Sequence, residues 1–344
     1  MTNFKDMTSA ELGSFLETLG EKKFRGKQIY HQMYSGAASF EEMTDLPAAL
    51  REKLSGMEKA GEISLNSMEI ARVQASASDG TRKYLFRLSD GNKIESVFMK
   101  YSYGNSICVS SQAGCRMGCR FCASTIGGLC RNLTPGEIID QILSVQRDTG
   151  EKINHVVVMG TGEPFDNYEN LSGFIRLANS KDGLNLGMRN ITVSTCGLVP
   201  KIKRFAQDFP QVNLAVSLHA PNSEIRSSMM PVNDSYDMSL LLLACREYTK
   251  VTNRRITFEY ALVSGVNDSM QRADELAEVL KGMLCHVNLI PLNKVTESGL
   301  TGSTRPEAKK FMERLEKHGI PATIRRELGS DIDAACGQLR LGRE

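Results

Sequence analysis

Gly114-Cys-Arg-Met-Gly-Cys-Arg-Phe-Cys122 is a short stretch with three thiols, and a regular alternation of apolar runs and helical segments begins after it. Cys115 and Cys119 are separated by three residues, and Cys119 and Cys122 by two. Thiolates are soft ligands for iron–sulfur clusters, zinc and copper(I). A structural zinc ion needs a fourth protein ligand, and a simple electron-carrying [4Fe–4S] cluster needs four cysteines. Three thiolates therefore predict a cubane cluster with one iron open to a substrate.

The chain after the thiol stretch predicts a parallel sheet. The predicted strands are His155–Met159, Asn190–Ser194, Val212–Leu218, Arg255–Val263, Cys285–Ile290 and Ala322–Arg325. The predicted helices lie near residues 135–149, 168–179, 198–208, 238–250, 268–282 and 305–318. Strands that alternate with helices of this length form parallel α/β folds. Six such units predict an α/β fold of the incomplete (β/α)6 TIM-like barrel type, open on one side, with its chemistry at the C-terminal strand ends.

The region before the thiols divides into two parts. A capping-box pattern at Thr8 begins a first helix, which Gly20 ends, and further helices are expected around Phe24–Met33 and Ala48–Met57. Period-two alternation between about residues 68 and 99, with Asp-Gly turns, predicts a β-meander. We therefore expect a helical RNA-docking domain at 1–66, a meander linker at 67–100, a barrel core at 101–331 and a C-terminal segment at 332–344.

Composition excludes some classes of protein. The chain has 344 residues, 41% of them hydrophobic and 24% charged, which is ordinary for a globular protein. No apolar run approaches a membrane span, and nine cysteines without a secretory leader indicate a reducing cytoplasm. The net charge of +2 does not by itself indicate a nucleic-acid-binding protein. The basic residues nevertheless cluster locally, as at Lys22, Lys23, Arg25 and Lys27, and such patches fit phosphate contacts.

Polar residues recur at the predicted C-terminal strand ends. They are Gly162 and Glu163 in Gly160-Thr-Gly-Glu-Pro164, Ser194, the run Ser217-Leu218-His219, and Asn293. A carboxylate such as Glu163 can accept a charge-assisted bond from an ammonium group. Any one of these residues is ordinary at a strand end, but their recurrence favours a bound polar cofactor. His219 has no second ligand at metal-binding spacing, so we expect it to form hydrogen bonds.

The thiol spacing, with Phe121 before the last cysteine, resembles the signature of the radical S-adenosylmethionine (SAM) enzymes. That resemblance implies that Cys115, Cys119 and Cys122 hold a [4Fe–4S] cluster whose open iron binds SAM. The run at Gly162 and Glu163 resembles the family's motif for the SAM amino group. Further SAM contacts are then expected from the strand-end residues Ser194, Ser217, Leu218, His219 and Asn293.

Over nearly its whole length the chain resembles the RlmN family. The motifs that carry the resemblance are Cys108-Val-Ser-Ser-Gln-Ala-Gly-Cys115, the thiol triad, Gly162-Glu-Pro164, Ser217-Leu-His-Ala-Pro221 and Asp331-Ile-Asp-Ala-Ala-Cys336-Gly-Gln-Leu339. The resemblance implies methylation of adenosine at C2, in 23S rRNA (adenosine 2503) and at adenosine 37 of tRNAs, with two SAM consumed. It also implies as partners 23S rRNA, free or in an immature large subunit, tRNA, and an electron donor such as flavodoxin, and it implies a monomer.

The resemblance assigns three residues outside the cluster. Cys336 would accept a methyl group from the first SAM, and a radical made from the second would activate that S-methyl group for addition to adenine C2. Cys108 would release the product by forming a transient disulfide with Cys336, and Glu95 would accept a proton. Two alternatives stay open: a Cfr-type enzyme that methylates adenine C8, and a non-catalytic iron–sulfur or zinc RNA-binding module.

Overall fold

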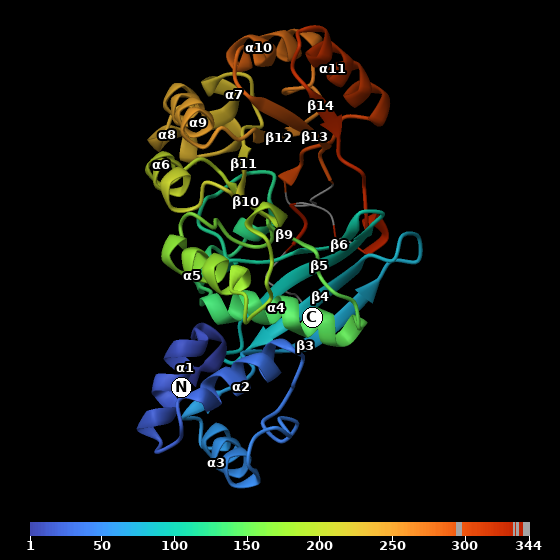
Figure 1. Ribbon diagram of the computed structural model, residues 1–344. Helices are drawn as coiled ribbons and strands as arrows, with labels where there is room; N and C mark the ends of the chain where they lie inside the picture. The colour runs from blue at the N-terminus through green and yellow to red at the C-terminus, as the bar shows by residue number, and fades with distance from the viewer. Residues whose placement is uncertain (294–297, 333, 335–336, 340–344) are drawn as a thin grey trace.

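A ten-stranded curved sheet forms the centre of the molecule in the computed structural model, which describes residues 1–293, 298–332, 334 and 337–339 (Figure 1). The strand order is β14-β13-β12-β11-β10-β9-β6-β5-β4-β3. The parallel strands are β6 (Gly104–Cys108), β9 (His155–Val158), β10 (Ile191–Thr195), β11 (Asn213–Ser217), β12 (Ile256–Leu262), β13 (Cys285–Pro291) and β14 (Ala322–Ile324). The predicted incomplete barrel is confirmed.

Helices follow the parallel strands and cover the outer side of the sheet (Figure 1). They are α4 (Pro135–Thr149), α5 (Tyr168–Asn179), α6 (Val199–Asp208), α7 (Ser223–Met229), α8 (Val232–Ser235), α9 (Met238–Thr252), α10 (Met270–Leu280) and α11 (Arg305–Lys317). Capping boxes begin α4 at Thr134 and α11 at Thr304. One continuous hydrophobic core fills the space between these helices and the sheet. This core fixes the strand ends on which the polar residues stand.

The β-meander is part of the same sheet. Strands β3 (Met68–Ala75), β4 (Arg82–Leu88) and β5 (Lys93–Tyr101) run antiparallel, and β6 pairs antiparallel with β5 but parallel with β9. The parallel part therefore begins at β6, one strand earlier than the sequence indicates. The reason is that β6 leaves one edge unpaired by the meander, and β9 occupies it. The expected boundary at residue 100 falls within β5.

The N-terminal helices form a separate small core at one end of the molecule, beside α4 (Figure 1). They are α1 (Ser9–Thr18), α2 (Phe24–Tyr34) and α3 (Ala48–Lys59), with a short parallel pair of β1 (Thr2–Asn3) and β2 (Ile63–Ser64). The capping box at Thr8 is present, and Gly20 takes a φ of 83° just beyond α1. A fully buried lysine, Lys5 in the 3-10 turn Phe4–Asp6, pairs with Asp140 of α4 and joins this core to the barrel.

Two smaller elements complete the site region. Strands β7 (Gln112–Gly114) and β8 (Leu129–Asn132) pair antiparallel on either side of the thiol loop. The C-terminal 3-10 turn Ser330–Ile332 lies beyond β14. Within the described residues, no helix has the length and apolar character needed to cross a membrane.

Candidate active site

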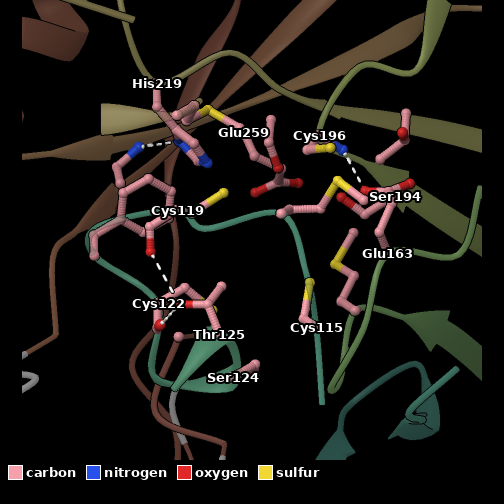
Figure 2. Close-up of a pocket in the computed structure, with 18 of the residues that line it drawn as sticks. Cys115, Cys119, Cys122, Ser124, Thr125, Glu163, Ser194, Cys196, His219 and Glu259 are labelled. Carbon is pink, nitrogen blue, oxygen red and sulfur yellow. Dashed lines mark hydrogen bonds between the residues drawn. The ribbon is translucent and has the colours of Figure 1, made fainter. Parts of the chain in front are cut away.

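A cavity opens at the C-terminal ends of the parallel strands, and Figure 2 shows the side chains around it. It encloses ≈ 950 Å³, including space open to solvent. The residues expected from the sequence that line it are Cys115, Cys119, Cys122, Gly162, Glu163, Ser194, Ser217, His219 and Asn293. Segments far apart in the sequence therefore meet at one place.

The thiol loop is held by backbone hydrogen bonds. Cys115 N donates to the Gly128 carbonyl at 2.9 Å, and Arg120 N donates to the Met229 carbonyl at 3.0 Å. Burial raises the pKa of the Cys115 thiol to about 12 and also raises that of Cys119. These thiols would become thiolates only next to a strong positive charge such as bound iron.

The arrangement of the thiols fits a cluster. Within the described part of the chain, no three His, Cys, Asp or Glu side chains converge as the ligands of a single metal ion would. The three thiols instead line one side of the cavity. A cubane cluster occupies such a space, and the donor set of three cysteines suits it.

Glu163 lines the same cavity as the thiols, above Cys115 and across from Cys119 and Cys122 in Figure 2, and its orientation is fixed by hydrogen bonds. Its carboxylate accepts hydrogen bonds from Cys196 N at 2.7 Å and Phe165 N at 3.0 Å. Burial raises the pKa of Glu163, and these hydrogen bonds oppose that rise. A buried carboxylate held in this way is suited to receive an ammonium group from the cavity.

Two glycines allow the strand-end turn to approach its neighbours. Gly162 has a φ of 109°, and a Cβ there would lie 2.6 Å from the Cβ of Gln112. A Cβ on Gly160 would lie 2.8 Å from Ser110 N. Both distances are shorter than any ordinary contact, so a larger residue would displace Glu163 from the cavity.

His219 forms hydrogen bonds, as expected. Its Nδ1 accepts from Ala261 N at 2.9 Å, and its ring packs edge-on against Phe121 of the thiol loop with centroids 4.8 Å apart. Burial, and to a lesser extent the nearby Arg226, lower the pKa of His219 to about 3. The imidazole is therefore neutral at physiological pH, with its Nε2 carrying the proton.

Three of the expected residues lie elsewhere. Leu218 is fully buried in the hydrophobic core and does not line the cavity. Glu95 lies on β5 and pairs with Lys83, their Oε1 and Nζ atoms 3.3 Å apart, both side chains 9% exposed. Cys108 ends β6 and lines an adjoining pocket that shares Met159 and Asn293 with the main cavity. Roles for these residues stay predictions.

Cys336 lies outside the described residues, but residues on both sides of it are described. Ala334 packs in a small apolar cluster with Cys108, Val97 and Met99. The Gly337 carbonyl accepts from Ala123 N at 2.8 Å, directly after the thiol loop. Among the described residues of this segment, Ala334 and Leu339 thus pack against β5 and β6, and Gly337 lines the cavity.

Sequence reasoning missed several residues at the site. Glu259 lines the cavity and accepts from Asn288 Nδ2 at 2.8 Å, and burial raises its pKa. Cys196 and Arg325 also line the cavity. A carboxylate inside the apolar run Thr257-Phe-Glu-Tyr-Ala-Leu262 was a usable signal for Glu259. The positions of Cys196 and Arg325 depend on how the strands are paired.

An open β/α barrel with a C-x3-C-x2-C loop and a Gly-Glu-Pro turn at its mouth defines a radical SAM enzyme. The sequence profile of the Radical SAM superfamily matches residues 109–277, and that of the ribosomal RNA large subunit methyltransferase N-terminal domain matches residues 2–59. A crystal structure of a radical SAM methyltransferase from Sphaerobacter thermophilus superposes with a TM-score of 0.94 at 44% identity, covering 99% of this chain and 100% of that one.

Two curated relatives cover the chain almost completely. Proteins named probable dual-specificity RNA methyltransferase RlmN, from Lachnospira eligens and Clostridium novyi, are 54% and 52% identical over 341 residues, which is 99% of this chain and 96% and 98% of theirs. The chain belongs to the RlmN family of radical SAM methyltransferases. Its cofactors are a [4Fe–4S] cluster and SAM.

Proposed function

We propose that this enzyme methylates C2 of adenosine in RNA, at adenosine 2503 of 23S rRNA and at adenosine 37 of tRNAs, through a methyl group carried on Cys336. The observation that carries the proposal is the course of the C-terminal segment. Ala334 packs beside Cys108, and Gly337 is bonded to Ala123 next to the thiol loop. These contacts of the described residues on either side of position 336 support a role for Cys108 and Cys336 at one site.

The protein's own groups have distinct tasks in this scheme. The cluster and SAM, when bound, supply a methyl group and a 5′-deoxyadenosyl radical. Cys115, Cys119 and Cys122 hold the cluster, while Glu163, Ser194, Ser217, His219 and Asn293 orient SAM. Cys336 carries the methyl carbon into a thioether with the base. The Cys108 thiolate would then attack the thioether sulfur, so that a Cys108–Cys336 disulfide forms, the bond between that sulfur and the methyl carbon breaks with its electron pair on carbon, and a proton taken up there completes the methyl group of the product. This is nucleophilic catalysis split into feasible steps.

Glu95 is proposed as the proton acceptor for adenine C2. It lies on β5 near Cys108, since Val97 is the strand partner of Cys108. Its Oε1 lies 3.3 Å from Lys83 Nζ, which fixes the position of the carboxyl group. The proposed disulfide must be reduced after each turnover by a thiol reductant, which fits a reducing cytoplasm. A one-electron donor such as flavodoxin would reduce the cluster.

An exposed surface on α2 suits single-stranded RNA. On α2, Phe24 is 52% exposed with the Arg25 guanidinium 4.7 Å from its ring centroid, and Lys23 and Lys27 flank it. Aromatic faces next to cations bind unpaired bases and phosphates. This surface supports the role of residues 1–66 in RNA docking.

The site of methylation can be tested directly. RNA from a strain without the gene and from the complemented strain is digested, and mass spectrometry locates the methyl group. We expect 2-methyladenosine only in the complemented strain, in both rRNA and tRNA. A methyl group at adenine C8 would instead identify the Cfr-type activity, and unmodified RNA would favour a binding module.

The carrier scheme makes a second prediction. Cys108→Ala retains the methyl carrier but lacks the thiol that releases the product, so we expect RNA to stay covalently attached to the protein. A denaturing gel before and after ribonuclease measures this as a shifted, nuclease-sensitive band. Cys130→Ala, which changes an exposed cysteine on β8, is the matched control and should show no band. Free, normally methylated RNA from Cys108→Ala would contradict the scheme.

A further inference from the structure

Arg226 on α7 is a fully buried cation behind the wall of the cavity, with 0% of its surface exposed. Its Nη2 donates to the Cys196 carbonyl at 2.6 Å and to the Ser217 carbonyl at 3.3 Å, and its Nη1 donates to Asn233 Oδ1 at 3.0 Å. Its Nε finds no hydrogen-bond partner within the described residues. The guanidinium therefore spans the ends of β10 and β11.

All the acceptors of Arg226 in the described part of the chain are neutral oxygens, and no carboxylate there pairs with it. A buried charge without a counter-ion is expensive, and removing one partner of a buried pair costs several kcal/mol in typical proteins. A hydrophobic residue, or a glutamine able to donate to the same carbonyls, would avoid this cost. The positive charge of Arg226 therefore indicates a negatively charged partner that binds after the chain has folded.

The place of Arg226 identifies that partner. Cys196 and Ser217, whose carbonyls it holds, both line the cavity. Met229, at the end of the same helix, accepts from Arg120 N in the thiol loop, and Met230 lines the cavity itself. The ionisable side chains nearest the guanidinium include the Cys119 and Cys196 thiols, and Cys119 is an expected ligand of the cluster. The positive charge thus lies directly behind the loop that holds the cluster.

We infer that Arg226 is a positioning residue whose fixed charge compensates the negative charge of the bound cluster and favours the reduced cluster. A cubane held by three thiolates has net negative charge, and one electron from an external one-electron donor makes it more negative by one unit. Reduction potentials of such clusters depend on net charge, burial and hydrogen bonds. A buried cation acts through a low-dielectric interior and is poorly screened by salt. This inference rests on the cofactor and not on the identity of the RNA substrate.

The test is an anaerobic redox titration of the reconstituted protein with dithionite, followed by electron paramagnetic resonance. Arg226→Gln keeps hydrogen-bond donors but removes the charge, so we expect a more negative midpoint potential. Arg226→Lys keeps the charge with fewer donors and should stay near the wild-type potential. If the hydrogen bonds alone mattered, the order of the two variants would be reversed.

A second variant leaves Arg226 in place. Asn233→Asp puts a carboxylate where the Asn233 amide oxygen accepts from Nη1, which neutralises the guanidinium without moving it. We expect a shift in the same direction as for Arg226→Gln, persisting at high salt. Asn233→Asp also tests the inference by itself if Arg226→Gln fails to fold or to load the cluster. Arg246→Gln is the matched control, because Arg246 on α9 also donates to two backbone carbonyls, those of Lys281 and Val279, but is exposed and does not line the cavity.

The outcomes separate cleanly. More negative potentials for Arg226→Gln and Asn233→Asp, with Arg226→Lys and Arg246→Gln near wild type, support the inference. An unchanged potential in either neutralised variant overturns it, and so does a shift in Arg226→Lys as large as that in Arg226→Gln. Circular dichroism and iron content establish that each variant is folded and loaded before the comparison.

Discussion

Among the described residues, two cationic side chains, Lys5 and Arg226, are buried to 0% exposure, and their surroundings differ. Lys5, where the N-terminal helical core meets α4, pairs with Asp140, which also accepts from Ser67 N at 2.7 Å and Ser67 Oγ at 2.9 Å. Arg226, behind the thiol loop, contacts only neutral oxygens among the described residues. Folding alone gives Lys5 a negative partner, whereas the charge of Arg226 is available to compensate a negatively charged bound group.

This difference separates a structural ion pair from a functional one. A buried pair that is complete within the chain fixes how two parts of the molecule fit together. A buried cation that lacks a partner stores electrostatic free energy that a negative ligand recovers on binding. The pKa of Lys5 is lowered chiefly by burial, with Asp140 opposing that change, so the pair depends on both residues.

The largest expected effect comes from breaking the complete pair. Lys5→Met leaves the buried Asp140 carboxylate with Arg147 alone, whose Nη2 lies 3.8 Å from Asp140 Oδ1, so the loss of unfolding free energy should approach the about 3–5 kcal/mol of a typical broken buried pair. Urea denaturation of the cluster-free protein measures it. Arg87→Met is the control, because Arg87 and Glu69 form an exposed pair whose loss costs less than about 1 kcal/mol. If Lys5→Met loses as little unfolding free energy as Arg87→Met, the buried Lys5–Asp140 pair does not stabilise the fold as expected.

A smaller effect is expected at the incomplete site. Arg226→Met leaves no carboxylate unpaired and costs only the hydrogen bonds to two carbonyls and an amide, about 1–3 kcal/mol in the cluster-free protein. Loading the cluster should increase the loss for Arg226→Met, since the wild type then gains a charge pair. It should leave the loss for Lys5→Met unchanged. Equal losses with and without the cluster at both positions would contradict the distinction.

The smallest effect concerns His219, the neutral base next to Arg226. Its pKa in the folded protein is about 3, against 6.5 as the ordinary value. As pH falls below 6.5, the unfolded chain binds a proton that the folded protein does not, so stability decreases. From pH 7 to pH 5 this amounts to about 2 kcal/mol for a fully expressed shift. Unfolding free energies of wild type and His219→Asn at the two pH values measure the difference, and Asn tolerates the φ of 55° at this position.

The opposite pH response would also be informative. If His219→Asn loses as much stability on acidification as the wild type, the imidazole does not stay neutral in the folded state. The hydrogen bond from Ala261 N to Nδ1 would then have to break at mildly acidic pH.

Much of the site was predictable because its signals are local. The cysteine spacing, the capping box at Thr8 and the turn at Gly162 each lie within a few residues, and short-range geometry fixes what such patterns can form. The alternation of apolar runs with helical segments likewise determined the parallel barrel, because strands buried on both faces need helices between them. Because the strands are parallel, the polar residues at their C-terminal ends lie at the same edge of the sheet.

Pairings between distant segments were decided only by the tertiary structure. The sequence does not predict that β6 pairs with β9 or that Leu218 is buried in the core. It also does not predict that Glu95 forms an ion pair with Lys83. Nor does it indicate that Arg226 is buried with no carboxylate partner in the part of the chain that the structure describes, since an arginine on a short helix usually lies at the surface. The sequence by itself determined which chemistry this protein carries. The packing of α7 against the ends of β10 and β11 decided which charge lies behind that chemistry, because burial and the absence of a partner are properties of the whole fold.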